Sequence, residues 1–443
     1  MADPAPRPDH PADPADLTQQ PDQRHPHFSP HREPLPRRPG EPRGSHPDHD
    51  AIHLIGGQFW GRNPHPELSW MRASAPVYWD ERSQAWGIAK HADVRYASLH
   101  PETFSSAGGI RADAPSVPMM IDMDDPAHLR RRKLVNEGFT PRRVAGLQPR
   151  IRQVCDQILD RVCERGECDF VWDIAAPLPL IMIADALGTA PEDRDLLMRW
   201  SDDLLRGLTD VSDADLAGRA AAAFEGYFGY ASRVIADRRD NPRDDLISSL
   251  VHAEIDGDRL DHESLVHESL LILIGGDETT RHVLSGGAYQ LFTHPAQRQL
   301  LIDDPGRIPV AVEEMLRWVS PIKNMNRTLT RDIELRGQVL REGDNALLLY
   351  PSANRDEDVF ADPFRFDVTR RPNEHLAFGV GSHFCLGNSL ARLELTVMFE
   401  RLLDRFPDME PMQQAEPGYR PANFISGYES LPVRFSPSPA VGR

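Results

Sequence analysis

Residues 375–394 read HLAFGVGSHFCLGNSLARLE and place one cysteine, Cys385, among three glycines, Gly379, Gly381 and Gly387. The run 386–403 carries apolar residues at helical spacing, so we expect the thiol to lie at a helix N-terminus. There the free N–H groups and the positive end of the helix dipole stabilise a thiolate, the form of cysteine that binds metals or attacks electrophiles. The glycines let the backbone turn sharply and let a flat partner come close.

Three interpretations of Cys385 compete. A buried structural cysteine does not explain the flanking glycines. Glycine loses more conformational entropy on folding than other residues, so its presence here suggests that something needs the space. A nucleophilic cysteine needs a base; His383 is two residues away, but such a base generally comes from elsewhere in the fold. An axial thiolate ligand of haem iron uses both the glycines, which make room for the macrocycle, and the N–H groups that point at sulfur.

The ten residues FGVGSHFCLG, 378–387, resemble the haem-binding loop of the cytochrome P-450 family at each of its defining positions. The resemblance implies a mainly α fold with small β-sheets, the triangular-prism haem-thiolate domain, and haem b as cofactor. It implies that Cys385 is the axial iron ligand and that His383 reaches a haem propionate. Phe378, Gly379 and Gly387 are then haem-contacting positions of the same loop.

The composition of the chain excludes several classes of protein. The chain of 443 residues has a formal net charge of −18, which argues against binding to nucleic acid or to an anionic membrane. No run approaches the ~20 apolar residues that a membrane span needs, and the N-terminus lacks the layout of a secretion signal. We therefore expect a cytoplasmic protein. Cys155, Cys163 and Cys168 match no zinc spacing and are interpreted as small packed thiols.

The chain divides near residue 50. Residues 1–49 hold 13 of the 40 prolines, and residues 1–50 hold six histidines, so we expect 1–50 to be a disordered extension. Residues 51–443 are expected to form a single domain. Apolar periodicity predicts helices at 127–137, 143–164, 177–187, 191–207, 215–239, 261–293, 309–319 and 388–405. Short β-like runs lie at 76–79, 332–335 and 346–349.

A long apolar helix is interrupted at 270–280, LLILIGGDETT. Two glycines inside a helix cost about 1 kcal/mol each relative to alanine, and close packing against another helix is one explanation. The acid and hydroxyl residues that follow favour another, because burying them is expensive without water or ligand. In the family's pattern, Glu278 is the acid and Thr279 the alcohol that relay protons during activation of dioxygen, whereas Thr280 is expected to bond back to a carbonyl.

Charged residues elsewhere match further positions of the family. Glu314 and Arg317 correspond to its Glu-x-x-Arg pair, a buried structural network that we expect Arg365 to complete, although spacing alone would fit a surface pair. His128, Arg132 and Arg327 are the expected partners of the haem propionates. Their neighbours Arg130, Arg131 and Lys133 are expected to form a solvated basic face that attracts an acidic ferredoxin.

No flavin or nicotinamide fingerprint is present, so electrons are expected from a separate ferredoxin and its NAD(P)H-dependent reductase. The expected reaction inserts one atom of O2 into an unactivated C–H bond of a large apolar molecule. We expect that molecule to contact apolar residues of three separate segments: Ile274, Gly275, Ile322, Met325 and Phe424.

Four segments, 120–144, 270–282, 313–318 and 420–427, resemble the actinobacterial steroid side-chain oxidases. That resemblance implies oxidation of a terminal methyl group of cholesterol or cholest-4-en-3-one, with further oxidation to the acid open. Hydroxylation of methyl-branched fatty acids is the close alternative. Tailoring of a secondary metabolite is weaker, as is a non-catalytic haem sensor, which has no need of Glu278 and Thr279.

Overall fold

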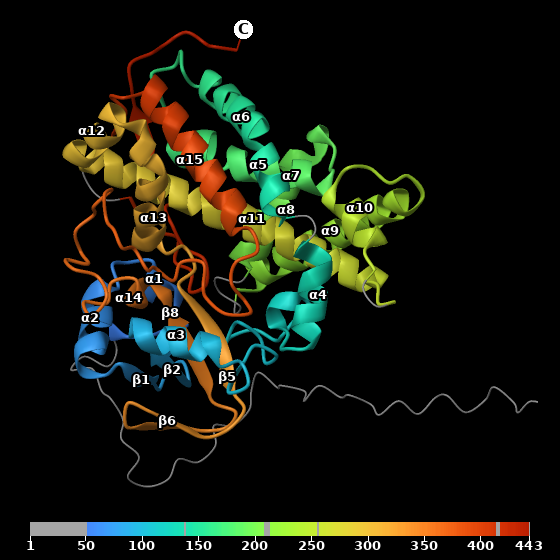
Figure 1. Ribbon diagram of the computed structural model, residues 1–443, viewed down its shortest axis with the longest axis vertical. Helices are drawn as coiled ribbons and strands as arrows, with labels where there is room; N and C mark the ends of the chain where they lie inside the picture. The colour runs from blue at the N-terminus through green and yellow to red at the C-terminus, as the bar shows by residue number, and fades with distance from the viewer. Residues whose placement is uncertain (1–50, 137–138, 208–212, 255–256, 413–416, 443) are drawn as a thin grey trace, which may run out of the picture.

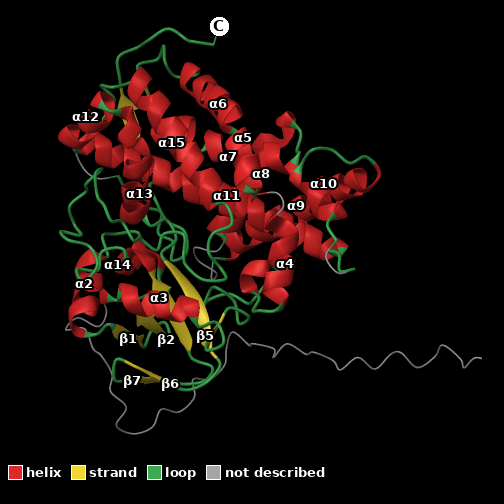
Figure 2. Cartoon of the chain, viewed as in Figure 1, coloured by secondary structure: helices red, strands yellow, loops and turns green. Residues whose placement is uncertain are grey.

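The computed structural model describes residues 51–136, 139–207, 213–254, 257–412 and 417–442. The predicted N-terminal extension, 1–50, lies outside these residues. Helices dominate and strands form small sheets, so the predicted fold class is confirmed (Figure 2). The helices are α1 (Gly57–Trp60), α2 (His65–Ser74), α3 (His91–Leu99), α4 (Ala127–Asn136), α5 (Pro141–Gly146), α6 (Gln148–Asp160), α7 (Pro177–Leu187), α8 (Arg194–Arg206), α9 (Ala214–Asp240), α10 (Leu246–His252), α11 (His262–Thr293), α12 (Pro295–Asp303), α13 (Ile308–Val319), α14 (Tyr350–Ala353) and α15 (Asn388–Arg405).

The strands form three sheets among the described residues. They are β1 (Val77–Asp80), β2 (Ala85–Ile88), β3 (Phe104–Ser105), β4 (Glu167–Asp169), β5 (Asn324–Leu329), β6 (Ile333–Leu335), β7 (Gln338–Leu340), β8 (Asn345–Leu349), β9 (Glu410–Pro411) and β10 (Pro432–Arg434). The largest sheet has the order β1-β2-β8-β5-β3, in which only β2 and β8 are parallel. The smaller sheets are β4-β10-β9 and β6-β7. Figure 1 shows the large sheet on one side of the molecule and most helices on the other.

Helix α11 runs through the middle of the helical part and is buried on nearly every side (Figure 1). Its N-terminus is capped by Asp261, whose side chain accepts the N–H of Ser264 at 2.7 Å. Its buried residues include apolar side chains such as Leu273 and charged ones such as Glu278, so α11 belongs to the interior of the helical part.

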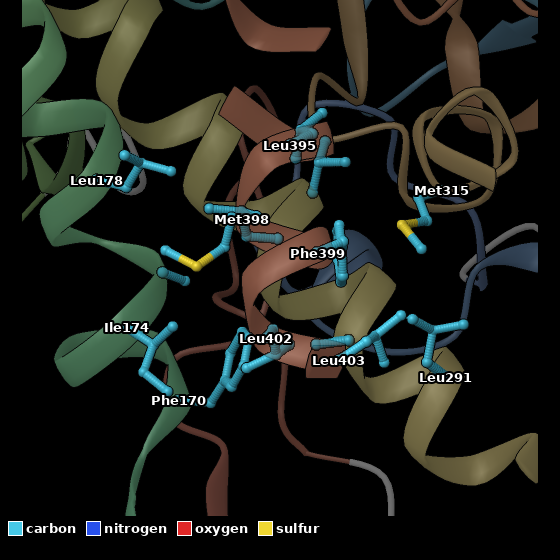
Figure 3. Packing of buried hydrophobic residues seen from close by; sticks show 14 of the residues in the cluster. Phe170, Ile174, Leu178, Leu291, Met315, Leu395, Met398, Phe399, Leu402 and Leu403 are labelled. Carbon is cyan, nitrogen blue, oxygen red and sulfur yellow. The ribbon is translucent and has the colours of Figure 1, made fainter. Parts of the chain in front are cut away.

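The main hydrophobic core fixes α15 against its neighbours. Met398 faces Ile174 on one side, whereas Leu403 points toward Leu291 of α11 on the other (Figure 3). Each large apolar side chain buried in this way contributes about 1.5–3 kcal/mol. Because α15 begins directly after the cysteine loop, this core holds the end of the loop in place.

Two predicted helices begin or divide differently in the structure. The predicted helix 143–164 is two helices, α5 and α6, because Pro149 lies in the first turn of α6 and cannot continue a preceding helix. The predicted helix 191–207 begins with one 3₁₀ turn, Pro191–Asp193, before α8. Helices α2, α3, α10 and α12 were not predicted.

One stretch of the described residues, Phe170–Leu187, is long and apolar enough to cross a membrane, with a mean hydropathy of 1.7. It comprises a π-helical segment and α7. Within the protein 67% of it is buried, and its side chains belong to the hydrophobic cores. Burial of this kind is typical of a core helix.

Candidate functional site

Cys385 lies in a tight loop that leads into α15, as its sequence predicted. The Cys385 N–H donates to the Phe378 carbonyl at 2.9 Å, and the Asn388 side-chain amide donates to the Cys385 carbonyl at 2.7 Å. Gly381 has a φ of +84° and lies so close to the Ser98 carbonyl that an added Cβ would approach it to 2.5 Å. The loop therefore needs glycine at this position for both its backbone conformation and its packing.

The start of α15 is directed at the sulfur. Burial raises the pKa of the Cys385 thiol, whereas hydrogen bonds from the N–H groups of Gly387 and Asn388 and the positive charges of Arg132 and Arg392 lower it. These groups would stabilise a thiolate. The arrangement is the one that a negatively charged metal ligand requires.

Open space borders the glycines of the loop and of α11. An added Cβ at Gly275 or Gly387 would meet no atom within 4 Å, and one at Gly379 would meet only the His383 carbonyl, at 3.9 Å, among the described residues. At Gly276, in contrast, an added Cβ would approach the Ile183 side chain to 3.1 Å. The explanation by close packing therefore holds for Gly276, while Gly275 faces free space.

The predicted propionate partners come together around His383. Its ring stacks on that of His128, with centroids 4.0 Å apart and planes inclined by 28°. Burial, with the charges of Arg327, His128 and Arg132, lowers the pKa of His383 to about 3, and its Nε2 is buried without a hydrogen-bond partner among the described residues. Arg327 is 4% exposed and forms no ion pair within the described part of the chain.

This cluster fits a haem. His128 already pairs with Asp125 at 3.1 Å. The buried cation of Arg327 and the unpartnered nitrogen of His383 are costly, and two propionates would supply their missing anionic partners. Arg132 also donates to the Ser382 carbonyl at 3.0 Å and to the Phe384 carbonyl, so it ties α4 to the cysteine loop. The donor set, the open space at the glycines and the thiol together match what haem b needs.

The predicted basic face of α4 is only partly correct. Arg130 is 64% exposed and Lys133 is exposed. Arg131, however, is 19% exposed and pairs with Glu268 at 3.1 Å. Glu268 is fully buried, and burial raises its pKa to about 7. Arg131 therefore anchors α4 to α11 because it offsets a buried carboxylate.

Glu278 is completely buried in a group of basic residues. Its Oε1 accepts from Arg281 at 2.6 Å and from Arg420, and lies 3.6 Å from His282 Nε2. Burial alone would raise the pKa of Glu278, but contact with His282 and the charges of Arg281 and Arg420 lower it to about 2. The carboxylate is therefore ionised and held away from the open side of α11.

Thr279 lies on the open side of the helix. Its Oγ1 donates to the Gly275 carbonyl at 2.8 Å, beside the free space at Gly275. The predicted bond from Thr280 back to a carbonyl one turn earlier is not found among the described residues. Thr279, four residues after Gly275, makes a bond of this kind instead. Glu278 and Thr279 are adjacent in sequence but lie on different faces of α11.

Arg420 and Asp202 belong to the site and were not predicted. Arg420 donates to Glu278, to Asp202 of α8 at 3.0 Å and to Glu429 at 3.0 Å. Arg420 and Glu278 are 142 residues apart in the chain, so no local spacing could have paired them. The presence of arginine in the segment 420–427 was the only available signal.

The Glu314 network forms, but its third member is Arg370. Arg317 donates from Nε and Nη2 to the two oxygens of Glu314 at 2.7 and 2.6 Å, and both residues are fully buried. Arg370 Nε donates to Glu314 at 3.1 Å. The predicted Arg365 is wrong in this role, because its side chain is 64% exposed and only its carbonyl meets Arg317 and Arg370.

The predicted substrate contacts lie on two sides of the protein interior. Ile274 packs at the edge of the core around α7 and α9, whereas Ile322 and Met325 pack at the edge of the core around the large sheet. Phe424 lies 5.4 Å from the Arg111 guanidinium. Each of the four is partly exposed. Phe378, from the cysteine loop, lies under Arg392 at 4.6 Å.

Comparisons with known proteins agree on one family. The family model for cytochrome P450 matches residues 308–426. A steroid C26-monooxygenase of Mycobacterium tuberculosis is 53% identical over 88% of this chain and 98% of its own. A methyl-branched lipid omega-hydroxylase of Mycobacterium bovis is 40% identical over 79% and 84%. The solved structure of CYP109E1 from Bacillus megaterium in complex with testosterone has a TM-score of 0.78 and 33% identity, covering 84% of this chain and 99% of that one.

Proposed function

Because this chain belongs to the cytochrome P450 family, we propose that it is a haem-thiolate monooxygenase that hydroxylates the terminal methyl group of a steroid side chain. The observation that carries the proposal is the glycine-bordered loop around Cys385, together with the free space beside Gly275 of α11, where Thr279 bonds back to the Gly275 carbonyl. A thiol before the start of α15 and free space beside α11, which continues as one helix through its two glycines, would provide the two sides of a haem site.

Haem b, when bound, supplies the chemistry that divides dioxygen and inserts one oxygen atom into a C–H bond. Cys385 would hold the iron as a thiolate, assisted by the N–H groups of Gly387 and Asn388. His128, Arg132, Arg327 and His383 would hold the propionates. These residues fix the orientation of the cofactor, and with it the side from which a substrate reaches it.

Protons would reach the open side of α11 through the hydroxyl group of Thr279. Thr279 Oγ1 holds its proton toward the Gly275 carbonyl and can exchange it with water beside Gly275. Glu278 is ionised and paired with Arg420, so it delivers a proton only after that pair loosens. Since Arg420 also pairs with Asp202 of α8, a movement of α8 would change the freedom of the Glu278 carboxylate.

The steroid assignment rests on the relatives. The relative that is 53% identical is named a steroid C26-monooxygenase, and the one that is 40% identical is named a methyl-branched lipid omega-hydroxylase. Both names describe attack at the end of a branched chain. The apolar, partly exposed side chains of Ile274, Ile322, Met325 and Phe424 would enclose such a chain end. Methyl-branched lipids are the second candidate substrate, and oxidation beyond the alcohol to the acid is part of the proposal.

Electrons would come from a ferredoxin and its NAD(P)H-dependent reductase, and the proposed location is the cytoplasm. Arg130 and Lys133, which are exposed on α4 close to the cysteine loop, would attract an acidic ferredoxin. Arg131 is excluded from this role, because it is paired with Glu268. The proposed domain is 51–443 as one unit.

A titration and a product analysis test the substrate. The ferric, haem-loaded protein is titrated with cholest-4-en-3-one and with a methyl-branched fatty acid, and the shift of the Soret band reports displacement of water from the iron. Turnover with a ferredoxin system then identifies the oxidised carbon by mass spectrometry. We expect saturable binding of the steroid and oxygen at its terminal methyl group. If only the branched fatty acid binds, methyl-branched lipids become the first candidate substrate in place of steroids. If neither ligand shifts the Soret band, both substrate proposals are refuted.

A further inference from the structure

A second cavity lies apart from the haem site. It has a volume of about 760 Å³ and lies between the segment that leads into α2, the C-terminal end of α11, the end of α13 and the residues after α14. Figure 1 shows α2, α13 and α14 on the same side of the molecule. None of the residues that line this cavity is one that we assign to haem, to proton transfer or to the steroid.

Two buried cations of this cavity have no acidic partner among the described residues. Arg355 is 3% exposed; its Nη2 donates to the Trp318 carbonyl at 2.9 Å, while its Nε and Nη1 have no hydrogen-bond partner there. Lys323 is 5% exposed, and its Nζ reaches only carbonyls, those of Ser320 at 3.0 Å and Val319 at 3.4 Å. Nδ1 of His65 is likewise buried without a partner.

Within the described residues the cavity is therefore positive. None of the described residues that line it is Asp or Glu. Burial and the charge of Arg355 lower the pKa of Lys323 to about 7, and burial with the charge of Arg317 lowers that of Arg355 to about 9. Burying an unpaired cation is expensive, and a protein rarely keeps two side by side unless an anion completes them. A bound anion would satisfy the free N–H groups of Arg355 and the ammonium group of Lys323.

The aromatic residues that line the rest of the cavity indicate what kind of ligand would fit it. Trp60, Tyr289, Trp318, Phe364 and Tyr419 supply aromatic surface around the charged end. The Arg355 guanidinium lies over Trp318 at 4.5 Å and near Phe364 at 6.0 Å, so one flat face of the cavity is already formed by stacked planes. Flat apolar groups pack well against such surfaces.

We propose that this cavity is a binding site for a monocarboxylate with a flat apolar body, whose carboxylate pairs with Arg355 and Lys323 and whose body lies against the aromatic walls. The Nε and Nη1 donors of Arg355 are the two that lack partners among the described residues, so a carboxylate oxygen can accept from either one. The site is independent of the proposed steroid reaction, since it shares no residue with the haem site.

The test compares a carboxylate with its neutral amide. The probe is 2-naphthoate, the matched neutral ligand is 2-naphthamide, and binding to the full haem-loaded chain is measured by isothermal titration calorimetry. The haem pocket is first filled with an azole that binds the iron, so that only the second cavity is free. The variants are Arg355→Met and Lys323→Met, and the control is Arg434→Met, a cation that is 66% exposed on β10.

We expect one saturable naphthoate site, binding of the amide at least about tenfold weaker, and a similar loss for Arg355→Met and Lys323→Met but not for Arg434→Met. Haem content and thermal midpoint establish that each variant is folded. If Arg355→Met does not fold, the comparison of naphthoate with naphthamide on the unaltered protein still decides. Equal affinity for the two ligands, unchanged affinity in the folded Met variants, or no saturable binding would overturn the proposal.

Discussion

Replacing Arg370 by Met should destabilise the protein, whereas replacing Arg365 by Met should not. Arg370 Nε lies 3.1 Å from Glu314, which is fully buried, and the Arg370 side chain is 9% exposed. Arg365 is 64% exposed and lies 3.9 Å from Asp367. The two arginines are close in sequence and differ in whether the side chain meets the buried carboxylate.

The size of the effect follows from the contacts. Hydrogen bonds to a charged group contribute about 1.5–3 kcal/mol. Arg317 still holds both oxygens of Glu314 in the variant, so the loss remains smaller than the ~3–5 kcal/mol expected for an unpaired buried charge. We therefore expect Arg370→Met to lower the free energy of unfolding by ~2–3 kcal/mol. The exposed Arg365 pair should contribute less than ~0.5 kcal/mol.

Urea unfolding of the haem-loaded protein, followed by far-ultraviolet circular dichroism and by the Soret band, measures both variants. Asn373, which also donates to Glu314 at 3.2 Å, lies just before the cysteine loop, so Arg370→Met should also speed the loss of haem. Equal midpoints for the two variants, or a larger effect of Arg365→Met, would refute the assignment of Arg370 to the network.

Three further predictions concern the haem site and its surroundings. Thr279→Val removes the hydroxyl beside Gly275 and should leave steroid binding unchanged. A larger share of the consumed NAD(P)H should then yield peroxide, which is measured as a lower amount of hydroxylated product per NAD(P)H consumed. Arg327→Met should weaken haem retention at least about tenfold relative to the exposed control Arg130→Met, measured as transfer of haem to apomyoglobin. Glu394→Gln should become progressively more stable than the unaltered protein as pH rises. Burial and the charge of Asp277 raise the pKa of Glu394 from 4.5 to about 8. The unaltered protein therefore has the full stability contribution of neutral Glu394 below about pH 4.5 and loses it as pH approaches 8, whereas the glutamine of the variant stays neutral. Thermal midpoints at pH 5.5 and 8 check this, and an equal difference at both values would contradict it.

Local patterns predicted the elements that carry their own signals. The predicted helix 177–187 has the bounds of α7, because Pro177 begins it and Gly188, with a φ of +73°, ends it. The predicted helix 388–405 likewise coincides with α15. The cysteine loop was predictable for the same reason, since its glycines, its thiol and its helix start lie within ten residues.

Contacts between distant segments were not predictable. Arg131 reaches Glu268 across 137 residues, and Arg370 reaches Glu314 across 56. In each case several arginines stand close together in sequence, and only the path of the backbone decides which one meets the carboxylate. The resemblance to the family identified Glu314 and Arg317 as a buried pair but could not choose correctly between Arg365 and Arg370.

The most direct test of the account is the absorption spectrum of the reduced, haem-loaded protein under carbon monoxide. Ligation of the iron by the Cys385 thiolate predicts a Soret band shifted to the long wavelength that marks sulfur-ligated haem, and Cys385→Ser should abolish that shift. A folded, haem-containing protein that binds carbon monoxide without the shifted band would contradict the assignment of Cys385 as the iron ligand, and with it the proposed reaction.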